Sequence, residues 1–332
     1  MDGKGGKAVM TTIEEYKESL RAYFDASLPA RLYDAHFHLA TFYKNRKTCT
    51  GEPVDEYRSF TEGVLCRPID GGLLMTSPSS KHTADWLAEE NEYVLGVAKE
   101  HGFKLGYVVS PTFHNAEGVD AYIRKNPDTV RALKPYLCYS TAEDNFEADI
   151  SAYTPEWMFE VANEHSMPIV LHLSHYGDML SDENNIRELR YFSGKYPKAK
   201  IVLAHCAMGH HVRKLRLGLP KIADLDNIYF DCSGCSETMS IYYCLQAFGV
   251  SRMMWGGDFS FGAQTGRVLS FGANFLGLHE GYLKTLPRDY RYEPLDNTTE
   301  CTLALLEAAE VLALGKSDLE AIFYDNAKAF YG

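Results

Sequence analysis

Histidine and aspartate residues end several short apolar segments of this 332-residue sequence, where they could bind a metal ion. His36 and His38 are two residues apart, so on a β-strand both side chains point to the same face. His172, His205 and Asp258 end three later segments. Imidazole nitrogens combined with a carboxylate oxygen form a ligand set that suits zinc or a similar divalent cation. We therefore expect one divalent metal ion, most simply zinc, on His36, His38, His172 and Asp258.

Such a site is expected to be catalytic. A zinc ion that keeps one coordination position open for water serves catalysis, and it lowers the pKa of that water to about 7. A His-x-His pair alone is a weak signal, because it often arises by chance. It gains weight here because four apolar segments, each recognised separately, end in ligands of the same types.

The elements that must position these residues are eight short apolar segments that alternate with segments of helical periodicity. The helical segments include residues 84–101, 154–165 and 186–196. Strands that alternate with helices pair in parallel, because a parallel connection needs a crossover. The eight predicted strands are residues 31–38, 71–77, 103–110, 130–139, 168–172, 200–205, 227–232 and 252–258.

Eight such units in series predict an α/β fold, a closed (β/α)8 or TIM barrel, because no phosphate-binding loop of an open doubly wound sheet follows the first strand. Residues 1–30 are expected to form an N-terminal helical extension, with a helix that starts at the capping pattern Thr12-x-x-Glu15. Residues 31–332 form a single barrel domain in this interpretation. Two closing helices are expected at 299–314 and 317–331, and long loops at 40–70 and 259–297.

Composition excludes some classes of function without selecting one. The net charge of −12 opposes binding to a nucleic-acid backbone. No apolar segment is long enough to cross a bilayer, and the N-terminal residues lack the apolar core of a signal peptide. The eight cysteines are therefore expected to be reduced thiols in a cytoplasmic protein. We expect a small-molecule substrate and no membrane or nucleic-acid partner, and the sequence is compatible with a homo-oligomer.

Several short motifs, taken in order, resemble the amidohydrolase superfamily. The closing segment 325–332 (DNAKAFYG) resembles the terminal helix of its amidohydrolase 2 branch, which contains metal-dependent hydrolases and decarboxylases. The resemblance covers about residues 32–332 and is specific to the superfamily rather than to one substrate. The motifs are Asp34-Ala35-His36-Phe37-His38, His172, Ala204-His205 and Gly257-Asp258.

The resemblance implies catalytic roles for two residues. His36, His38, His172 and Asp258 would again be the metal ligands. Asp258 would also move a proton from the water to the leaving group, a task that suits a carboxylate close to both metal and water. His205 would orient the water or stabilise negative charge that develops on the substrate.

Two further residues have roles that depend on the surroundings of the metal. Asp34 has the same strand parity as the two histidines, so it could hold one of their free N–H groups, or it could bond only to backbone. Lys134 could be a carboxylated bridge between two metals, as in binuclear members of the superfamily. It could instead contact an anionic substrate, and we favour one metal because the branch is mostly mononuclear.

Three residues in loops are weaker candidates for contact with the substrate. His175 and His210 follow strand ends and could reach the barrel mouth, although loop histidines are commonly solvated. Arg67 could pair with a substrate carboxylate, because a guanidinium binds carboxylates in a bidentate manner. A surface salt bridge is the alternative for Arg67.

The predicted function is a metal-dependent hydrolase that acts on a small amide, lactone or ester-like substrate. One alternative is a lyase on the same site, a non-oxidative decarboxylase of an unsaturated or aromatic acid. A second alternative is a barrel that binds a ligand without turnover, which the complete ligand set opposes. The identity of the substrate depends on the loops at 40–70 and 259–297.

Overall fold

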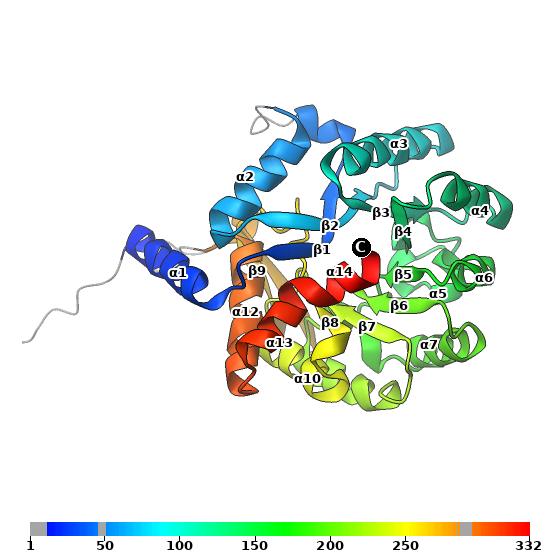
Figure 1. Ribbon diagram of the computed structural model, residues 1–332. Coiled ribbons are helices and arrows are strands. Elements are labelled where there is room, and N and C mark those ends of the chain that lie inside the picture. The colour runs from blue at the N-terminus through cyan, green and yellow to red at the C-terminus, as the bar shows by residue number, and fades with distance from the viewer. Residues whose placement is uncertain (1–11, 46–50, 284, 286–293) are drawn as a thin grey trace, which may run out of the picture.

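The computed structural model of the chain describes residues 12–45, 51–283, 285 and 294–332. Eight parallel strands follow one another in sequence order around a nearly closed barrel, which confirms the predicted (β/α)8 architecture (Figure 1). Their bounds are β1 Leu32–Leu39, β2 Ile69–Thr76, β3 Lys104–Val109, β4 Val130–Pro135, β5 Pro168–Leu171, β6 Lys200–Leu203, β7 Ile228–Asp231 and β8 Met253–Met254.

The barrel closes between its first and last strands through the segment that follows β8. The amide of Ala35 donates to the Trp255 carbonyl at 3.0 Å, and the amide of Asp258 donates to the His36 carbonyl at 2.7 Å. The predicted eighth strand at 252–258 is thus regular only over two residues. Asp258 lies in the segment beyond that strand, where it has a left-handed φ of 50°.

Helices surround the barrel and lie between consecutive strands, as Figure 1 shows. The helix predicted at 84–101 forms over that range, and the other two predicted inter-strand helices form within three residues of their expected starts. The principal helices are α2 Pro53–Leu65, α3 Ala84–His101, α4 Ala116–Lys125, α5 Ile150–Tyr153, α6 Glu156–Glu164, α7 Glu183–Lys195, α9 Val212–Gly218, α10 Thr238–Phe248 and α12 Asn297–Val311.

The N-terminal helix α1 (Ile13–Ser27) begins at the predicted capping box. Thr12 accepts a hydrogen bond from the Glu15 amide, and the Glu15 carboxylate accepts one from the Thr12 amide. These two bonds satisfy amides that the first helical turn would otherwise leave unpaired. The buried ring of Phe24 anchors the helix to the hydrophobic core.

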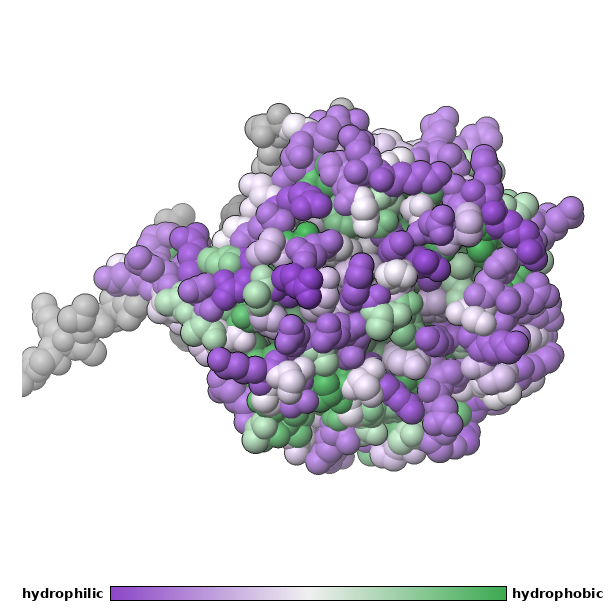
Figure 2. All heavy atoms as spheres, in the orientation of Figure 1, coloured by the Kyte–Doolittle hydropathy of each residue, from purple (hydrophilic) through white to green (hydrophobic). Residues whose placement is uncertain are grey.

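The C-terminal segment packs against the end of the barrel where the strands begin. It consists of α13 (Lys316–Glu320), a π-helical turn η7 (Ala321–Asp325) and α14 (Asn326–Tyr331). In Figure 1, α14 lies in red across the barrel. Tyr324 and Tyr331 join the cluster of side chains that fills the barrel interior, and Tyr331 is 1% exposed. Figure 2 shows that hydrophilic side chains cover most of this outer face.

The predicted loop 259–297 contains regular structure. Strands β9 (Gly266–Phe271) and β10 (Asn274–His279) form an antiparallel hairpin, followed by the short helix α11 (Glu280–Leu283). Residues of this hairpin line the pocket at the other end of the barrel. No helix in the described part of the chain is both long and apolar enough to cross a membrane.

Candidate active site

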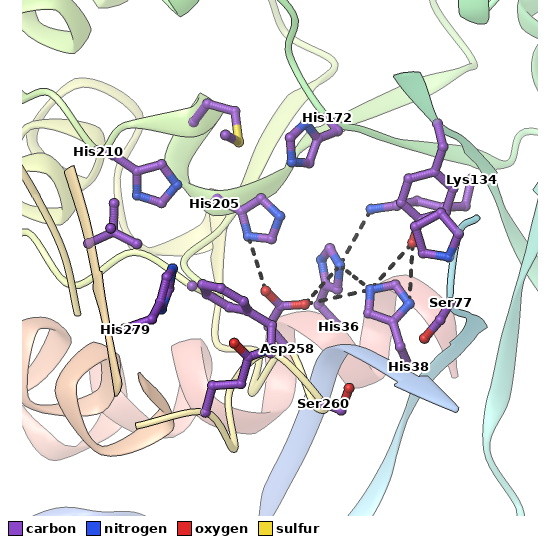
Figure 3. Close-up of a pocket in the computed structure, with 18 of the residues that line it drawn as sticks. His36, His38, Ser77, Lys134, His172, His205, His210, Asp258, Ser260 and His279 are labelled. Carbon is purple, nitrogen blue, oxygen red and sulfur yellow. Dashed lines mark hydrogen bonds and ion pairs between the residues drawn. The ribbon is translucent and has the colours of Figure 1, made fainter. Parts of the chain in front are cut away.

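A cavity of about 690 Å³ opens where the strands end. Strand ends, the loops that follow them and the β9–β10 hairpin all contribute to its wall, and Figure 3 shows the principal side chains. Active sites of this barrel fold lie at the same end. The lining residues that the sequence singled out are His36, His38, Lys134, His172, His205, His210 and Asp258.

Hydrogen bonds at the far side of each ring fix the tautomers of His36 and His38. The Nδ1 of His36 lies 3.0 Å from the Oδ2 of Asp231, and hydrogen bonds from His36 and Ser233 hold the pKa of Asp231 below its usual range against the effect of burial. The Nδ1 of His38 lies 3.3 Å from the Thr76 carbonyl, which can only accept. Both Nδ1 atoms therefore carry protons, and both Nε2 atoms keep a lone pair.

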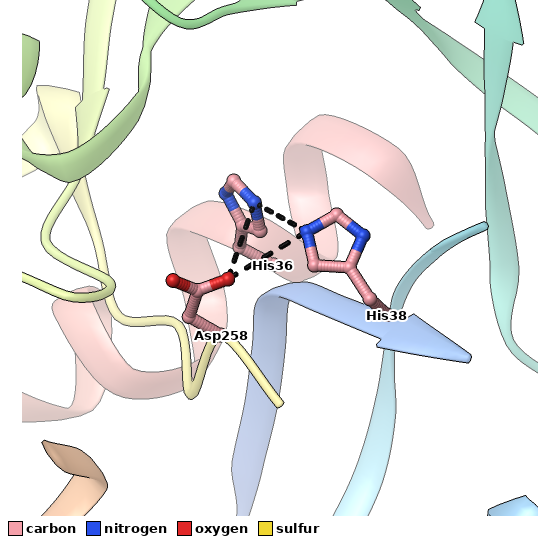
Figure 4. Close-up of side chains that lie close together, drawn as sticks. All are labelled: His36, His38 and Asp258. Atoms are coloured by element: carbon pink, nitrogen blue, oxygen red, sulfur yellow. Dashed lines mark hydrogen bonds and ion pairs between the residues drawn. The ribbon is translucent and has the colours of Figure 1, made fainter. Parts of the chain in front are cut away.

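The two lone pairs face the same point in space. The Nε2 atoms of His36 and His38 are 3.1 Å apart, and the Oδ1 of Asp258 lies 3.8 Å and 3.6 Å from them, respectively (Figure 4). No proton is available between the two nitrogens to relieve their repulsion. Three donor atoms from three buried residues thus converge as a divalent cation requires. The donor set fits a metal ion.

Asp258 connects this cluster to the next part of the pocket. Its other oxygen, Oδ2, lies 3.9 Å from the Nδ1 of His205. Burial raises the pKa of Asp258 well above its usual value, and the charge of Lys134 opposes this shift. A carboxyl group with a raised pKa is a stronger proton acceptor than a solvated one, which suits a role in proton transfer.

His205 lies in a left-handed turn, α8 (Ala204–Met208), directly after β6. The φ angles of His205, Cys206, Ala207 and Met208 are between 52° and 60°, which costs about 1 kcal/mol for each residue that has a Cβ atom. Strained backbone of this kind is concentrated at functional sites. The Nδ1 of His205 donates to the Ser233 carbonyl at 2.7 Å, so its Nε2 atom is the one that can accept.

His172 lies in the same pocket but outside the tight cluster of three ligands. Its ring centroid is 5.1 Å from that of His205. Its Nδ1 atom is buried and has no hydrogen-bond partner among the described residues. An unpaired buried nitrogen at this place is compatible with a fourth ligand, and the assignment of His172 stays a prediction.

Lys134 is fully buried beside the metal cluster. Its Nζ atom lies 3.4 Å from the Nε2 of His36, and burial lowers the lysine pKa to about 8. The ammonium therefore donates to one of the lone pairs that would bind the metal. Lys134 is close enough to act on a ligand at this site, and the choice between a carboxylated bridge and an anion contact stays open.

Asp34 does not hold either imidazole. A bulge in β1 between Asp34 and Phe37 shifts the register against β2, and the Asp34 side chain accepts from the Tyr57 hydroxyl of α2 and the amides of His36 and Gly257. The bulge breaks the strict alternation of faces on which the parity argument depended. Asp34 therefore supports the His36 ligand through backbone alone.

Asp231, at the end of β7, is the carboxylate that the sequence reasoning missed. Its Oδ2 bonds to His36, while its Oδ1 accepts from the His205 amide at 3.1 Å and from the Ser233 hydroxyl. It orients His36, a candidate metal ligand, together with the backbone of the strained turn, as carboxylates that bond to ligating histidines do. Its place at the end of an apolar strand was the available signal.

The three weaker candidates occupy different places. His210 is buried in the pocket wall. His175 lies within 3.4 Å of Glu147 and Asp149 in the loop after β5, outside the pocket lining. Arg67 precedes β2, at the opposite end of the barrel.

There Arg67 bonds to Asp25 and the Pro29 carbonyl, and the described pocket lining does not include it. The structure thus favours the salt-bridge alternative for Arg67.

The fold and the converging donors define a (β/α)8-barrel protein with a candidate metal site at the barrel mouth. The amidohydrolase family model (Amidohydro_2) matches residues 33–332, so the chain belongs to this family. No curated protein sequence matches the chain.

Solved structures share the fold at low sequence identity. An amidohydrolase of Burkholderia multivorans with bound zinc is 14% identical, with a TM-score of 0.57 over 91% of this chain and 99% of the other. A 5-carboxyvanillate decarboxylase of Novosphingobium aromaticivorans, complexed with manganese and 4-hydroxy-3-methoxy-5-nitrobenzoic acid, is 12% identical, with a TM-score of 0.53 over 92% and 96%.

A proposed 2-pyrone-4,6-dicarboxylic acid hydrolase of Pseudomonas putida is 16% identical, with a TM-score of 0.55 over 92% of this chain and 98% of the other. The structural neighbours thus include both hydrolases and decarboxylases, and both zinc and manganese proteins. At these identities the likeness shows the common fold and leaves the reaction open.

Proposed function

We propose that this protein is a metal-dependent hydrolase that acts on a small amide, lactone or ester-like substrate. The observation that carries the proposal is that the Nε2 atoms of His36 and His38 lie 3.1 Å apart and face the Asp258 carboxylate in the pocket at the barrel mouth. His36, His38 and Asp258 would hold one divalent cation, most simply zinc, with His172 as the fourth ligand. A cation in this position polarises a carbonyl group and acidifies water.

Side chains of the protein transfer the proton, orient the water and hold the histidines in place. Asp258, whose pKa burial raises, accepts the proton of the attacking water and returns it to the leaving group. The Nε2 of His205 orients the water on the same side of the pocket, because its Nδ1 proton is held by the Ser233 carbonyl. Asp231 keeps the ring of His36 and the backbone of His205 in place.

The test is the metal content and activity of a single ligand variant. His38→Ala removes one lone pair, so we expect the folded variant to lose bound metal and turnover together. Metal content is measured by atomic emission after reconstitution with zinc, and hydrolysis with a panel of lactones, amides and aryl esters. His172→Ala tests the fourth ligand in the same way. A His38→Ala protein that keeps its metal and its activity would refute the proposal.

A decarboxylase on the same site is the second candidate. It is favoured by the fully buried Lys134, which places a cation beside the ligand cluster where a substrate carboxylate could lie. Incubation of aromatic and unsaturated acids in water labelled with oxygen-18 separates the two reactions. Hydrolysis places the label in the product, whereas decarboxylation releases carbon dioxide and leaves the organic product without it.

A further inference from the structure

The part of the pocket farthest from Lys134 is built from the β9–β10 hairpin and the loop after β6. His210, from that loop, and His279, from the end of β10, lie together on one side of the cavity (Figure 3). Phe275 of the hairpin packs against the His210 ring with centroids 5.2 Å apart, and Phe261 meets the His279 ring edge-on at 5.6 Å. We call His210, His279, Phe261 and Phe275 the hairpin wall.

The polar groups of the hairpin wall differ from those on the opposite side of the pocket. There, the Tyr43 hydroxyl bonds to Ser77 and accepts from Ser260 at 2.8 Å. In the hairpin wall, the Nδ1 atoms of both His210 and His279 are buried and have no hydrogen-bond partner among the described residues. Buried polar atoms are nearly always paired in native proteins, so these two nitrogens leave unused hydrogen-bonding capacity in the hairpin wall.

Strands β9 and β10 position the two histidines of the hairpin wall. The Ser270 hydroxyl of β9 donates to the His210 carbonyl at 3.2 Å and accepts from the Val212 amide at 3.2 Å. On β10, a Cβ atom at Gly277 would lie 2.8 Å from the Nε2 of His279. The absence of a side chain at Gly277 therefore leaves the room that the His279 ring occupies.

The charge around the wall limits the kind of group that can bind there. Burial and the neighbouring His205 lower the pKa of His210 to about 3, so this imidazole is neutral at physiological pH. The charged side chains in the described lining are Lys134 and Asp258, both in or beside the metal cluster. A substrate carboxylate against the hairpin wall would thus lack a countercharge. A neutral imidazole can instead donate a hydrogen bond to an uncharged group or accept one from it.

We propose that His210 and His279 recognise an uncharged hydroxyl or carbonyl group on a planar ring substrate, whose reacting carbonyl group lies at Asp258. This inference rests on the proposed function for the position of the reacting group. The aromatic rings of Phe261 and Phe275 supply flat apolar surface for such a ring.

The experiment measures binding to the full-length, zinc-loaded protein by isothermal titration calorimetry. The probes are 2-naphthoate, 6-hydroxy-2-naphthoate and 2,6-naphthalenedicarboxylate, which differ only at the end far from the shared carboxylate. We expect the hydroxyl compound to bind about tenfold more tightly than 2-naphthoate, because it satisfies otherwise unpaired groups. The dicarboxylate is expected to bind more weakly than the hydroxyl compound.

Substitutions in the hairpin wall then test which residues cause the preference for the hydroxyl compound. His210→Phe and His279→Phe keep a ring but lose the nitrogens, so the preference for the hydroxyl compound should fall toward onefold while 2-naphthoate binds as before. Gly277→Val, which displaces the His279 ring, should act like His279→Phe. The matched control is His101→Phe, at the C-terminal end of α3 and outside this pocket, which should keep the full preference.

Circular dichroism and zinc content identify any variant that fails to fold, and the remaining variants then decide the outcome. Tightest binding by the dicarboxylate, an unchanged preference in the folded variants, or no binding by any probe would overturn the inference. These measurements need no turnover. A protein with the hydroxyl preference but no hydrolysis would refute the proposed function alone, and an active hydrolase without the preference would refute this inference alone.

Discussion

The two ends of the barrel are built from the same eight strands and differ in almost every other respect. The mouth holds buried histidines, Asp258 and Lys134, a left-handed turn at 205–208 and nitrogens that have no hydrogen-bond partner in the described part of the chain. The base is closed by η7 and α14, whose tyrosines pack into an apolar interior. Burial is nearly complete at both ends, so burial alone does not distinguish a functional region.

The difference lies in what burial costs at each end. At the base, apolar side chains gain stability when they leave water. At the mouth, burial disfavours the charged forms of His36, His38 and Asp258, and the backbone at His205 adds strain. The mouth is therefore stabilised by the rest of the barrel, and changes at the two ends should have opposite consequences for activity and stability.

The largest effect is expected from Asp258→Asn. The amide cannot accept the proton, so kcat should fall by about 10³-fold or more, and zinc should bind more weakly. The metal-free variant should unfold at the same denaturant concentration as metal-free wild type, or at a higher one, because a carboxyl group whose charge is disfavoured by burial has been removed. A large loss of stability in the metal-free variant would contradict the view that Asp258 at the mouth does not stabilise the fold.

The second largest effect is expected from a substitution at the base of the barrel. Tyr331→Ala removes a fully buried ring and should lower the free energy of unfolding by about 3–5 kcal/mol, measured by urea denaturation. The kcat of the folded fraction should be unchanged. Tyr331→Phe is the matched control, because the hydroxyl is buried with no partner among the described residues, so its loss should leave the stability unchanged or raise it by about 1 kcal/mol.

The third effect sharpens the role of Asp231 at the mouth. Asp231→Asn keeps the shape of the side chain but weakens the hold on the Nδ1 proton of His36, so zinc affinity should fall about 10- to 100-fold. Competition with a chromogenic chelator measures this affinity. Asp226→Asn, a fully exposed change just before β7, should leave it unaltered, and equal losses in both variants would remove Asp231 from the metal site.

The smallest effect is a pH dependence that distinguishes the mouth from the base. The pKa of His210 is lowered to about 3 in the folded protein from 6.5. Below pH 6.5 the unfolded chain binds a proton that the folded chain excludes, so the stability contributed by neutral His210 is present above pH 6.5 and lost as pH falls toward 3. One such fully buried group contributes a slope of about 1.4 kcal/mol per pH unit.

His210→Phe should reduce the loss of stability between pH 6.5 and 5.5 by about 1 kcal/mol, in keeping with one titrating group. The measurement is urea denaturation of the metal-free protein at both pH values. Tyr331→Phe, at the base, should leave the slope unchanged. An identical slope in wild type and His210→Phe would show that this imidazole does not stay neutral in the fold.

The sequence was sufficient to predict the barrel, because apolar periodicity marks each strand directly. It also predicted that His36, His38 and Asp258 would lie together, which they do, and their role as metal ligands stays a prediction. The sequence was insufficient for Asp34 and Asp231. Both are carboxylates at the edge of apolar segments, and the bulge in β1 that turns Asp34 toward Tyr57 has no local sequence signature.

The hairpin in the predicted loop 259–297 could have been found. Residues 266–271 and 274–279 flank Gly272 and Ala273 and are rich in apolar residues, which is a hairpin pattern. Its consequence for the site could not have been read, because the approach of His279 to His210 depends on tertiary packing. The place of Arg67 was equally inaccessible, since its partner Asp25 lies on another element.

The closure of the barrel brings together two candidate metal ligands that lie far apart in the sequence. His36 and Asp258 are joined through backbone as well as through their proposed shared ion, and they lie at the two ends of a chain segment of more than 200 residues. An ion held by both residues would crosslink the two ends of that segment. Part of the free energy of ion binding would then offset the entropy that the chain loses when these ends are brought together. We expect the metal-free protein to open first along the seam between β1 and β8, where hydrogen exchange of the Ala35 and Asp258 amides would report the event. Metal supply would then set the lifetime of the folded chain as well as its activity.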